Sequence, residues 1–160
     1  MRNYDFRLLT QDDLTLLRRW YSAAHVKVWW PDTDAQIARI TADMENPQVA
    51  MHIVELSHLP FAFISDFDAR TSAKPEFADL PVGTRVVETF VGNPDFLGPG
   101  HAAGYIEAWV RALRRSYSLV AVGPITTDTR AISIYRQAGF HNRRLAPTRD
   151  GKLVQVMTRL

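Results

Sequence analysis

A strand, a glycine-rich turn and a helix follow one another in the middle of this chain. The valine-rich run of residues 84–91 is typical of a strand, and residues 96–105 lead into a helical run that reaches residue 113. The first N–H groups of a helix lack partners within it, and the helix dipole favours negative charge at that end. Gly98 and Gly100 leave room for a phosphate to approach the backbone. The pattern indicates an anion site, although an ordinary strand-to-helix turn has the same composition.

Glu88 interrupts an apolar face of the strand before this turn. Side chains alternate along a strand, so Val86, Glu88 and Phe90 share one face. Burying a carboxylate without a partner is costly, which makes Glu88 a candidate for taking up a proton in acid–base chemistry. The alternative is a structural ion pair with Arg85 or Arg130.

Two further pairs of side chains are suited to binding a cation. Asp66 and Asp68 share one face at the end of another strand and could hold a cationic substrate, although solvated surface carboxylates give the same pattern. Trp29 and Trp30 could form the wall of a pocket. Adjacent side chains point in different directions, so we expect one of the two tryptophans to lie in the core.

Composition narrows the classes of protein. The 160 residues are 46% hydrophobic and 22% charged, which is typical of one globular domain, expected over residues 1–160. A net charge of +2 with no basic run argues against nucleic-acid binding, and no stretch has the apolar length of a signal peptide or membrane span. Cysteine is absent and the five histidines lack zinc-ligand spacing, so we expect no metal site and a cytoplasmic location.

The remaining elements must position these residues. We expect seven strands, at residues 4–9, 49–56, 61–67, 84–91, 119–122, 140–146 and 152–159. We expect four helices. The first begins at a capping box from Thr10 to Asp13 and reaches about Tyr21, and the others lie at residues 33–45, 100–117 and 128–138. Residues 68–81 are expected to form a surface loop. This order predicts an α/β fold with a mixed, mostly antiparallel sheet and helices on both faces.

Three segments resemble the GCN5-related N-acetyltransferase (GNAT) superfamily, and within it the aminoglycoside 6′-N-acetyltransferases. In order, they are Phe6 to Leu14 with Trp20, His25 and Trp29-Trp30; Glu88 with Leu97 to Ala102; and Arg130 to Phe140. The last segment is close to the superfamily's tyrosine-containing helix that ends in Gly-Phe. A glycine turn followed about 35 residues later by Tyr-x-x-x-Gly-Phe is considerably more specific than either motif alone.

The resemblance implies that the protein transfers an acetyl group from acetyl-CoA to a primary amine of a small cationic molecule. CoA would lie between the splayed parallel strands at residues 84–91 and 119–122. The implied cofactor-binding residues are Phe90, Val91, Leu97, Gly98, Gly100, His101, Ala102, Ala103, Asp128 and Arg130. The chain departs from the superfamily pattern at Leu97, where Arg or Gln is usual, at Pro99, which lacks an N–H donor, and at Asp128, where many relatives carry Asn.

The resemblance also assigns roles in catalysis. An alkyl ammonium has a pKa near 10.4, so a base must remove a proton before the nitrogen can attack a thioester. Glu88 falls where the related enzymes keep an acidic residue assigned as this base. Tyr135 falls where a tyrosine often stabilises or protonates the departing thiolate, although packing beside Ile132 would also explain it.

Trp29, Trp30, Asp66 and Asp68 are the expected substrate-binding residues. Two alternatives remain open within the same cofactor chemistry. One is an acyltransferase for a siderophore-type hydroxylysine or for a protein amino group, and the other is a catalytically silent acyl-CoA-binding module. The partner is expected to be a small molecule, and the chain to be a monomer or a homodimer.

Overall fold

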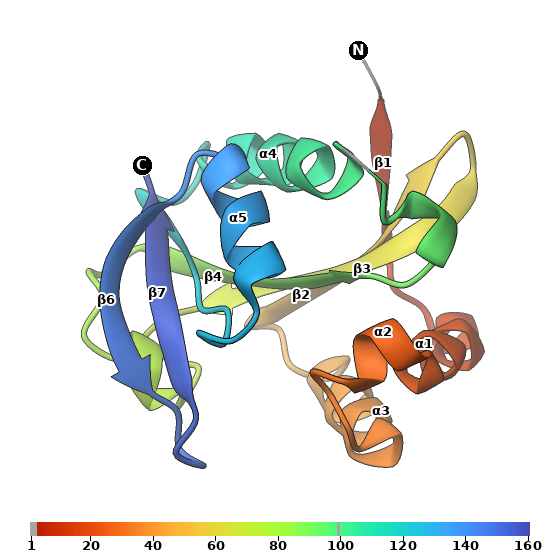
Figure 1. Ribbon diagram of the computed structural model, residues 1–160, viewed down its shortest axis with the longest axis horizontal. Coiled ribbons are helices and arrows are strands. Elements are labelled where there is room, and N and C mark those ends of the chain that lie inside the picture. Colours follow the sequence, from red (N-terminus) through yellow and green to blue (C-terminus); the bar gives the residue numbers. More distant parts are fainter. Residues whose placement is uncertain (1–2, 99) are drawn as a thin grey trace. The chain divides into compact units, whose positions relative to one another are not determined.

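A computed structural model describes residues 3–98 and 100–160 (Figure 1). The helices are α1 (Leu14–Ser22), α2 (Ala24–Lys27), α3 (Thr33–Asp43), α4 (His101–Leu113) and α5 (Thr129–Gln137). The strands are β1 (Tyr4–Leu8), β2 (Val49–Leu56), β3 (Leu59–Asp68), β4 (Thr84–Val91), β5 (Leu119–Val122), β6 (His141–Pro147) and β7 (Leu153–Arg159). Short 3-10 turns lie at Gln11–Asp13, Pro75–Phe77 and Pro94–Phe96.

The strands form one seven-stranded sheet in the order β1-β2-β3-β4-β5-β7-β6. The pairs β1–β2, β5–β7 and β6–β7 are antiparallel, whereas β4 and β5 are parallel. The predicted mixed α/β fold is therefore confirmed. The short helix α2 was not expected, and α4 ends at Leu113, before the expected residue 117.

The chain divides into two compact units. The first comprises Met1–Ser65 and Thr89–Ala102, and the second comprises Asp66–Glu88 and Ala103–Leu160. The core of the first unit is aromatic, with the ring of Phe90 lying 4.8 Å from Tyr21 and 5.7 Å from Phe63. Trp20 packs directly on the backbone at Gly92, where an added Cβ would lie 2.0 Å from the indole Cδ2. Only glycine fits there.

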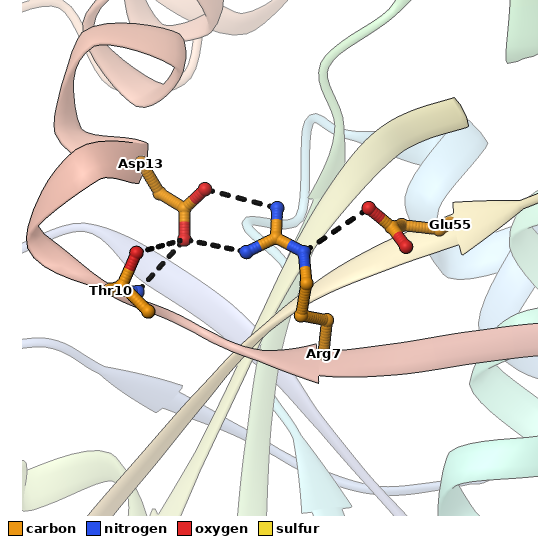
Figure 2. Close-up of polar contacts among 4 residues, drawn as sticks. All are labelled: Arg7, Thr10, Asp13 and Glu55. Atoms are coloured by element: carbon orange, nitrogen blue, oxygen red, sulfur yellow. Dashed lines mark hydrogen bonds and ion pairs between the residues drawn. The ribbon is translucent and has the colours of Figure 1, made fainter. Parts of the chain in front are cut away.

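A network of charged side chains fixes the entry to α1 (Figure 2). The Arg7 guanidinium donates to both carboxylate oxygens of Asp13, at 2.9 and 3.0 Å, and to Glu55 at 3.1 Å. Asp13 also accepts the backbone N–H of Thr10 at 2.8 Å, which completes the predicted capping box. Burial opposes ionisation of Asp13, but the hydrogen bonds from Arg7 and Thr10 and the Arg7 charge together hold its pKa below the ordinary value.

The second unit contains a buried ion pair that joins strands to α4. Asp66 is 1% exposed, and its Oδ1 accepts Arg85 Nε at 2.6 Å while its Oδ2 accepts Trp109 Nε1 at 2.9 Å. The Arg85 guanidinium also lies 5.1 Å from the centre of the Tyr117 ring. This unit further includes the adjacent strands β6 and β7, drawn in blue in Figure 1.

Candidate active site

The parallel strands β4 and β5 provide the framework of the candidate site. Their register pairs Thr84 with Leu119 and ends at Val86 with Ala121, so β4 continues beyond the pairing toward Val91. Ligands of open α/β sheets commonly bind at the carboxyl ends of parallel strands. Glu88 lies two residues beyond the last β4–β5 pair, on the part of β4 that is not paired with β5.

Glu88 and Tyr135 lie within electrostatic range of each other in the second unit. Glu88 is half-buried and its Oε2 is fully buried, whereas Tyr135 on α5 is 8% exposed. Burial raises the pKa of the Tyr135 phenol well above its ordinary value, and the charges of Tyr105, Glu88 and Asp128 raise it further. Tyr135 therefore stays protonated at physiological pH and can act as a hydrogen-bond donor.

Asp128 caps the beginning of α5. Its Oδ1 accepts the backbone N–H of Ala131 at 3.0 Å, which is the geometry of a helix N-cap. Burial raises the pKa of Asp128, while the Ala131 hydrogen bond and the charge of Arg130 oppose this shift. Arg130, in the first turn of the same helix, is exposed.

The glycine turn precedes α4 as the sequence predicts. An added Cβ at Gly98 would meet nothing within 4 Å, so the space beside that backbone is open. Gly100 has φ +92°, a left-handed conformation that favours glycine, and α4 begins at the next residue. Pro99 lies outside the described residues. This open backbone before thirteen helical residues fits the phosphate group that the fold implies.

His101, the first residue of α4, is anchored by an interaction that sequence reasoning did not predict. Its Nδ1 lies 3.1 Å from the Tyr4 hydroxyl, and its ring also contacts Phe61 and Phe96. The helix start is thereby fixed to β1 within the first unit. Leu97, Ala102 and Ala103, also expected at the cofactor, are half-buried around this turn.

The end of β4 is held by contacts from α2 and from β3. His25 Nε2 lies 2.9 Å from the Val91 carbonyl oxygen, and the next N–H, that of Gly92, donates to the Phe61 carbonyl at 2.8 Å. The carbonyl of Val91, one of the expected cofactor-binding residues, is thus already engaged. The sequence analysis named His25 only as part of the family resemblance. Because 66 residues separate His25 from Val91, no local pattern could predict their contact.

Trp29 and Trp30 follow α2 in the first unit and both are half-buried. The Trp30 ring packs 5.5 Å from Phe90 and 6.3 Å from Tyr21. One of the two tryptophans was expected to belong to the core, and Trp30 packs against the core cluster while staying half-buried.

The structure separates the two expected acidic substrate ligands. Both carboxylate oxygens of Asp66 are engaged inside the protein, so Asp66 is placed as a structural residue. The sequence left Arg85 as one of two possible ion-pair partners of Glu88. In the structure Arg85 pairs with Asp66 instead. Asp68 is half-buried, and its Oδ1 accepts the N–H groups of Arg70 and Thr71 at the start of the following loop.

The part of the chain that the structure describes has neither a metal-binding cluster nor a membrane-spanning helix. Residues 3–98 and 100–160 contain no group of three His, Cys, Asp or Glu side chains that could hold a metal ion. None of the helices in these ranges is both long enough and apolar enough to cross a membrane.

Parallel strands, an open glycine turn before a helix and a buried tyrosine are each features that the sequence analysis expects of a transferase that uses an acyl-CoA. Residues 10–147 match the acetyltransferase (GNAT) domain family. The aminoglycoside N(6′)-acetyltransferase type 1 of Klebsiella pneumoniae is 26% identical over 161 residues, which cover 94% of this chain and 80% of that protein.

Solved structures show the same fold. The aminoglycoside acetyltransferase AAC(6′)-Ib in complex with coenzyme A and kanamycin superposes with a TM-score of 0.86 at 24% identity, over 98% of this chain and 94% of that one. A chimera of the spermidine N-acetyltransferase SpeG from Vibrio cholerae and hSSAT gives a TM-score of 0.74 at 12% identity, over 98% of this chain and 94% of that one. The chain belongs to the GNAT family. It is an acetyl-CoA-dependent N-acetyltransferase.

Proposed function

We propose that the protein acetylates a primary amine of a small cationic molecule, in the manner of an aminoglycoside 6′-N-acetyltransferase. The observation that carries this proposal is that Glu88, on the part of β4 beyond its pairing with β5, lies close enough for its charge to act on the buried Tyr135 phenol. A proton acceptor and a proton donor are the two groups that amine acetylation requires. The named relatives act on aminoglycosides, which supports this acceptor class.

Acetyl-CoA supplies the acetyl thioester. Glu88 accepts a proton from the acceptor nitrogen, directly or through a water molecule, so that a lone pair is available to attack the thioester carbonyl. As the C–S bond breaks, Tyr135 donates a hydrogen bond or a proton to the thiolate. Because burial raises the pKa of the Tyr135 phenol, donation of a hydrogen bond to the thiolate is favoured over full transfer of the proton.

The cofactor contacts are proposed for the turn and for the strand end. The backbone of Gly98, Gly100 and the first residues of α4 would hold the pyrophosphate. On β4, the N–H groups at Phe90 and Val91 are the proposed pantetheine contacts, since the Val91 carbonyl bonds to His25. Asp128 and Arg130 remain predicted to lie beside the cofactor.

For the acceptor, Trp29, Trp30 and Asp68 remain our candidate contacts. Aromatic faces attract ammonium groups by about 0.5 to 2 kcal/mol per contact, and a carboxylate adds charge complementarity. Asp66 is left out of this set because Arg85 and Trp109 occupy its carboxylate. The cysteine-free composition supports a cytoplasmic location, and we keep monomer and homodimer as the proposed states.

Steady-state acetylation tests the proposal. Kanamycin-type aminoglycosides, lysine-like amines and short peptides are compared as acceptors, with the Glu88→Gln and Tyr135→Phe variants alongside. We expect turnover of the polycationic amines, a loss of about 10²- to 10⁴-fold in kcat for Glu88→Gln, and a milder loss for Tyr135→Phe. The exposed Glu45→Gln exchange, at the end of α3, serves as the control that retains full activity.

Each alternative has its own outcome in this experiment. Turnover confined to peptides would overturn the small-molecule acceptor. CoA binding without turnover of any amine would favour the silent acyl-CoA-binding module. An unchanged pH–rate profile in Glu88→Gln would remove Glu88 from the role of base.

A further inference from the structure

Part of the segment that the sequence predicts as a surface loop is buried. Within residues 68–81, the 3-10 turn Pro75–Phe77 buries Glu76 and Phe77, which are 7% and 4% exposed. Burial of Phe77 follows from its apolar ring. Burial of Glu76 does not, because removing an ionised carboxylate from water is costly unless hydrogen bonds or an opposite charge compensate. Glu76 therefore needs a partner.

The described part of the chain supplies no such partner. Within residues 3–98 and 100–160, the carboxylate of Glu76 accepts no hydrogen bond and belongs to no ion pair. Its Oε1 is fully enclosed, whereas Oε2 is not, so a cation can approach the carboxylate from one side. A water molecule could donate a hydrogen bond there but would not balance the charge. The side chain is thus suited to a cationic group from outside the chain.

The cations nearest along this turn are engaged elsewhere. Arg144 Nη2 donates to the backbone carbonyl of Glu76 at 3.0 Å and also to the carboxylate of Asp79. Arg144 Nε is enclosed without a partner among the described residues, so the guanidinium is not turned toward the Glu76 carboxylate. Lys74, just before the turn, has its Nζ 5.8 Å from the centre of the Phe67 ring. Asp79 therefore balances Arg144, and the charge of Glu76 stays unbalanced.

The backbone of this loop is fixed by the neighbouring hairpin. Arg144 comes from β6, and Arg149, from the turn between β6 and β7, donates to the Ala73 carbonyl at 2.8 Å. The Glu76 carbonyl itself is one of the two groups held in this way. A carboxylate on a backbone that is already positioned loses little freedom when it binds a ligand, so little binding free energy is lost to ordering.

The turn lies at the end of β5, within the second unit. A Cβ added at Gly123, the residue after β5, would lie 2.7 Å from Phe77 Cζ, so the Phe77 ring packs directly on that backbone. The parallel register of β4 and β5 ends two residues before Glu88 on one strand and two residues before Gly123 on the other. Glu76 and the proposed base Glu88 therefore belong to the same end of the parallel strand pair and to the same unit.

We propose that Glu76 binds a second ammonium group of the acceptor, distinct from the nitrogen that is acetylated. This inference rests on the proposed function, because it needs an amine as the acceptor substrate. An alkyl amine with a pKa near 10.4 is an ammonium at neutral pH, so it supplies both the charge and the N–H donors that this carboxylate lacks. Glu76 thereby makes the enzyme selective for acceptors with two or more amino groups over monoamines.

Two acceptors test this selectivity. Neamine carries several amino groups and 6-amino-6-deoxyglucose carries a single one, and both present a primary amine on a hydroxylated ring. In Glu76→Gln we expect kcat/KM for neamine to fall about 10- to 100-fold, mainly through KM, because a charge-assisted hydrogen bond is lost. The value for 6-amino-6-deoxyglucose should not change. Asp150→Asn, which removes the same charge from an exposed side chain of the same unit, is the matched control and should leave both values unchanged.

Binding and stability provide readouts besides turnover. The Kd of neamine for the CoA complex, by calorimetry, should rise in Glu76→Gln by about the same factor as KM. Glu76→Asp keeps the charge on a shorter side chain and should weaken binding less. The thermal midpoint of Glu76→Gln should be unchanged or higher, because an uncompensated buried charge has been removed.

The inference and the proposed function fail in different ways. An unchanged neamine preference in Glu76→Gln would overturn the inference while amine acetylation stands. A lower thermal midpoint together with an equal loss for both acceptors would also overturn it, because that result assigns Glu76 a structural role. If wild type acetylates neither acceptor, the proposed function itself fails, and the inference fails with it.

Discussion

At the scale of single residues, Gly98 and Gly100 lie in one turn but restrict substitution for different reasons. Gly100 has φ +92°, so any side chain there strains the backbone whether or not a ligand binds. At Gly98 the backbone conformation is not left-handed, and a Cβ would meet nothing within 4 Å. A substitution at Gly98 therefore tests ligand binding alone, whereas a substitution at Gly100 changes both ligand binding and the stability of the fold.

We expect Gly98→Trp to lower the affinity for CoA at least tenfold while changing the stability of the protein by less than about 0.5 kcal/mol. The physical reason is that the indole would fill the open space in which a phosphate approaches the backbone. Titration calorimetry gives the affinity and a urea melt gives the stability, with Gly98→Ala as the small-side-chain control. Wild-type CoA affinity in Gly98→Trp would show that the phosphate does not bind at this turn.

At the scale of an element, the beginning of α1 depends on an ionised Asp13. Its folded-state pKa is depressed, so its contribution to stability is present above the unfolded value of about 3.9 and is lost as pH falls through the lower folded value. We expect Asp13→Asn to destabilise the protein by about 1 to 2 kcal/mol at pH 7, because the Arg7 pair and the cap are lost.

Urea melts at pH 7 and at pH 3 measure this contribution. The difference between wild type and Asp13→Asn should shrink toward pH 3, where protonation of the wild-type carboxyl has begun to remove the same interactions. Asp12→Asn is the matched control, because Asp12 is exposed in the same turn and should behave as wild type at both pH values. An equal loss at both pH values would refute the assignment to ionised Asp13.

The elements that the sequence predicts well are those with local signals. Thr10 and Asp13 are three residues apart, and their capping box is present. The valine-rich run of residues 84–91 indicated β4. In contrast, the pairing of Asp66 with Trp109 spans 43 residues, and that of His25 with Val91 spans 66. No periodicity encodes such contacts, because they arise only when the sheet brings the elements together, and so Asp66 was expected at the substrate and not in an ion pair.

At the scale of the whole molecule, we propose a single folding domain despite the two compact units. Strand β3 passes from one unit to the other between Ser65 and Asp66, and β4 does so between Glu88 and Thr89. Neither unit can unfold without losing part of a continuous strand. This arrangement favours cooperative unfolding.

Calorimetry should accordingly show one thermal transition whose calorimetric and van't Hoff enthalpies agree. CoA at about 100 times its Kd should add about 2.7 kcal/mol of stability and raise the midpoint by several degrees. Pantetheine, which lacks the phosphates, serves as the control and should raise the midpoint less. Two resolved transitions would contradict the single domain.

The contact between Trp20 and Gly92 also limits the routes by which this sequence can diverge. A methyl group at position 92 would overlap the indole, with Cβ only 2.0 Å from Cδ2. A lineage that replaced Gly92 first would pass through a destabilised intermediate, whereas one that first exchanged Trp20 for a smaller side chain would lose packing but keep the backbone. The order of mutational steps is therefore set by the structure, and the tryptophan must change before the glycine can.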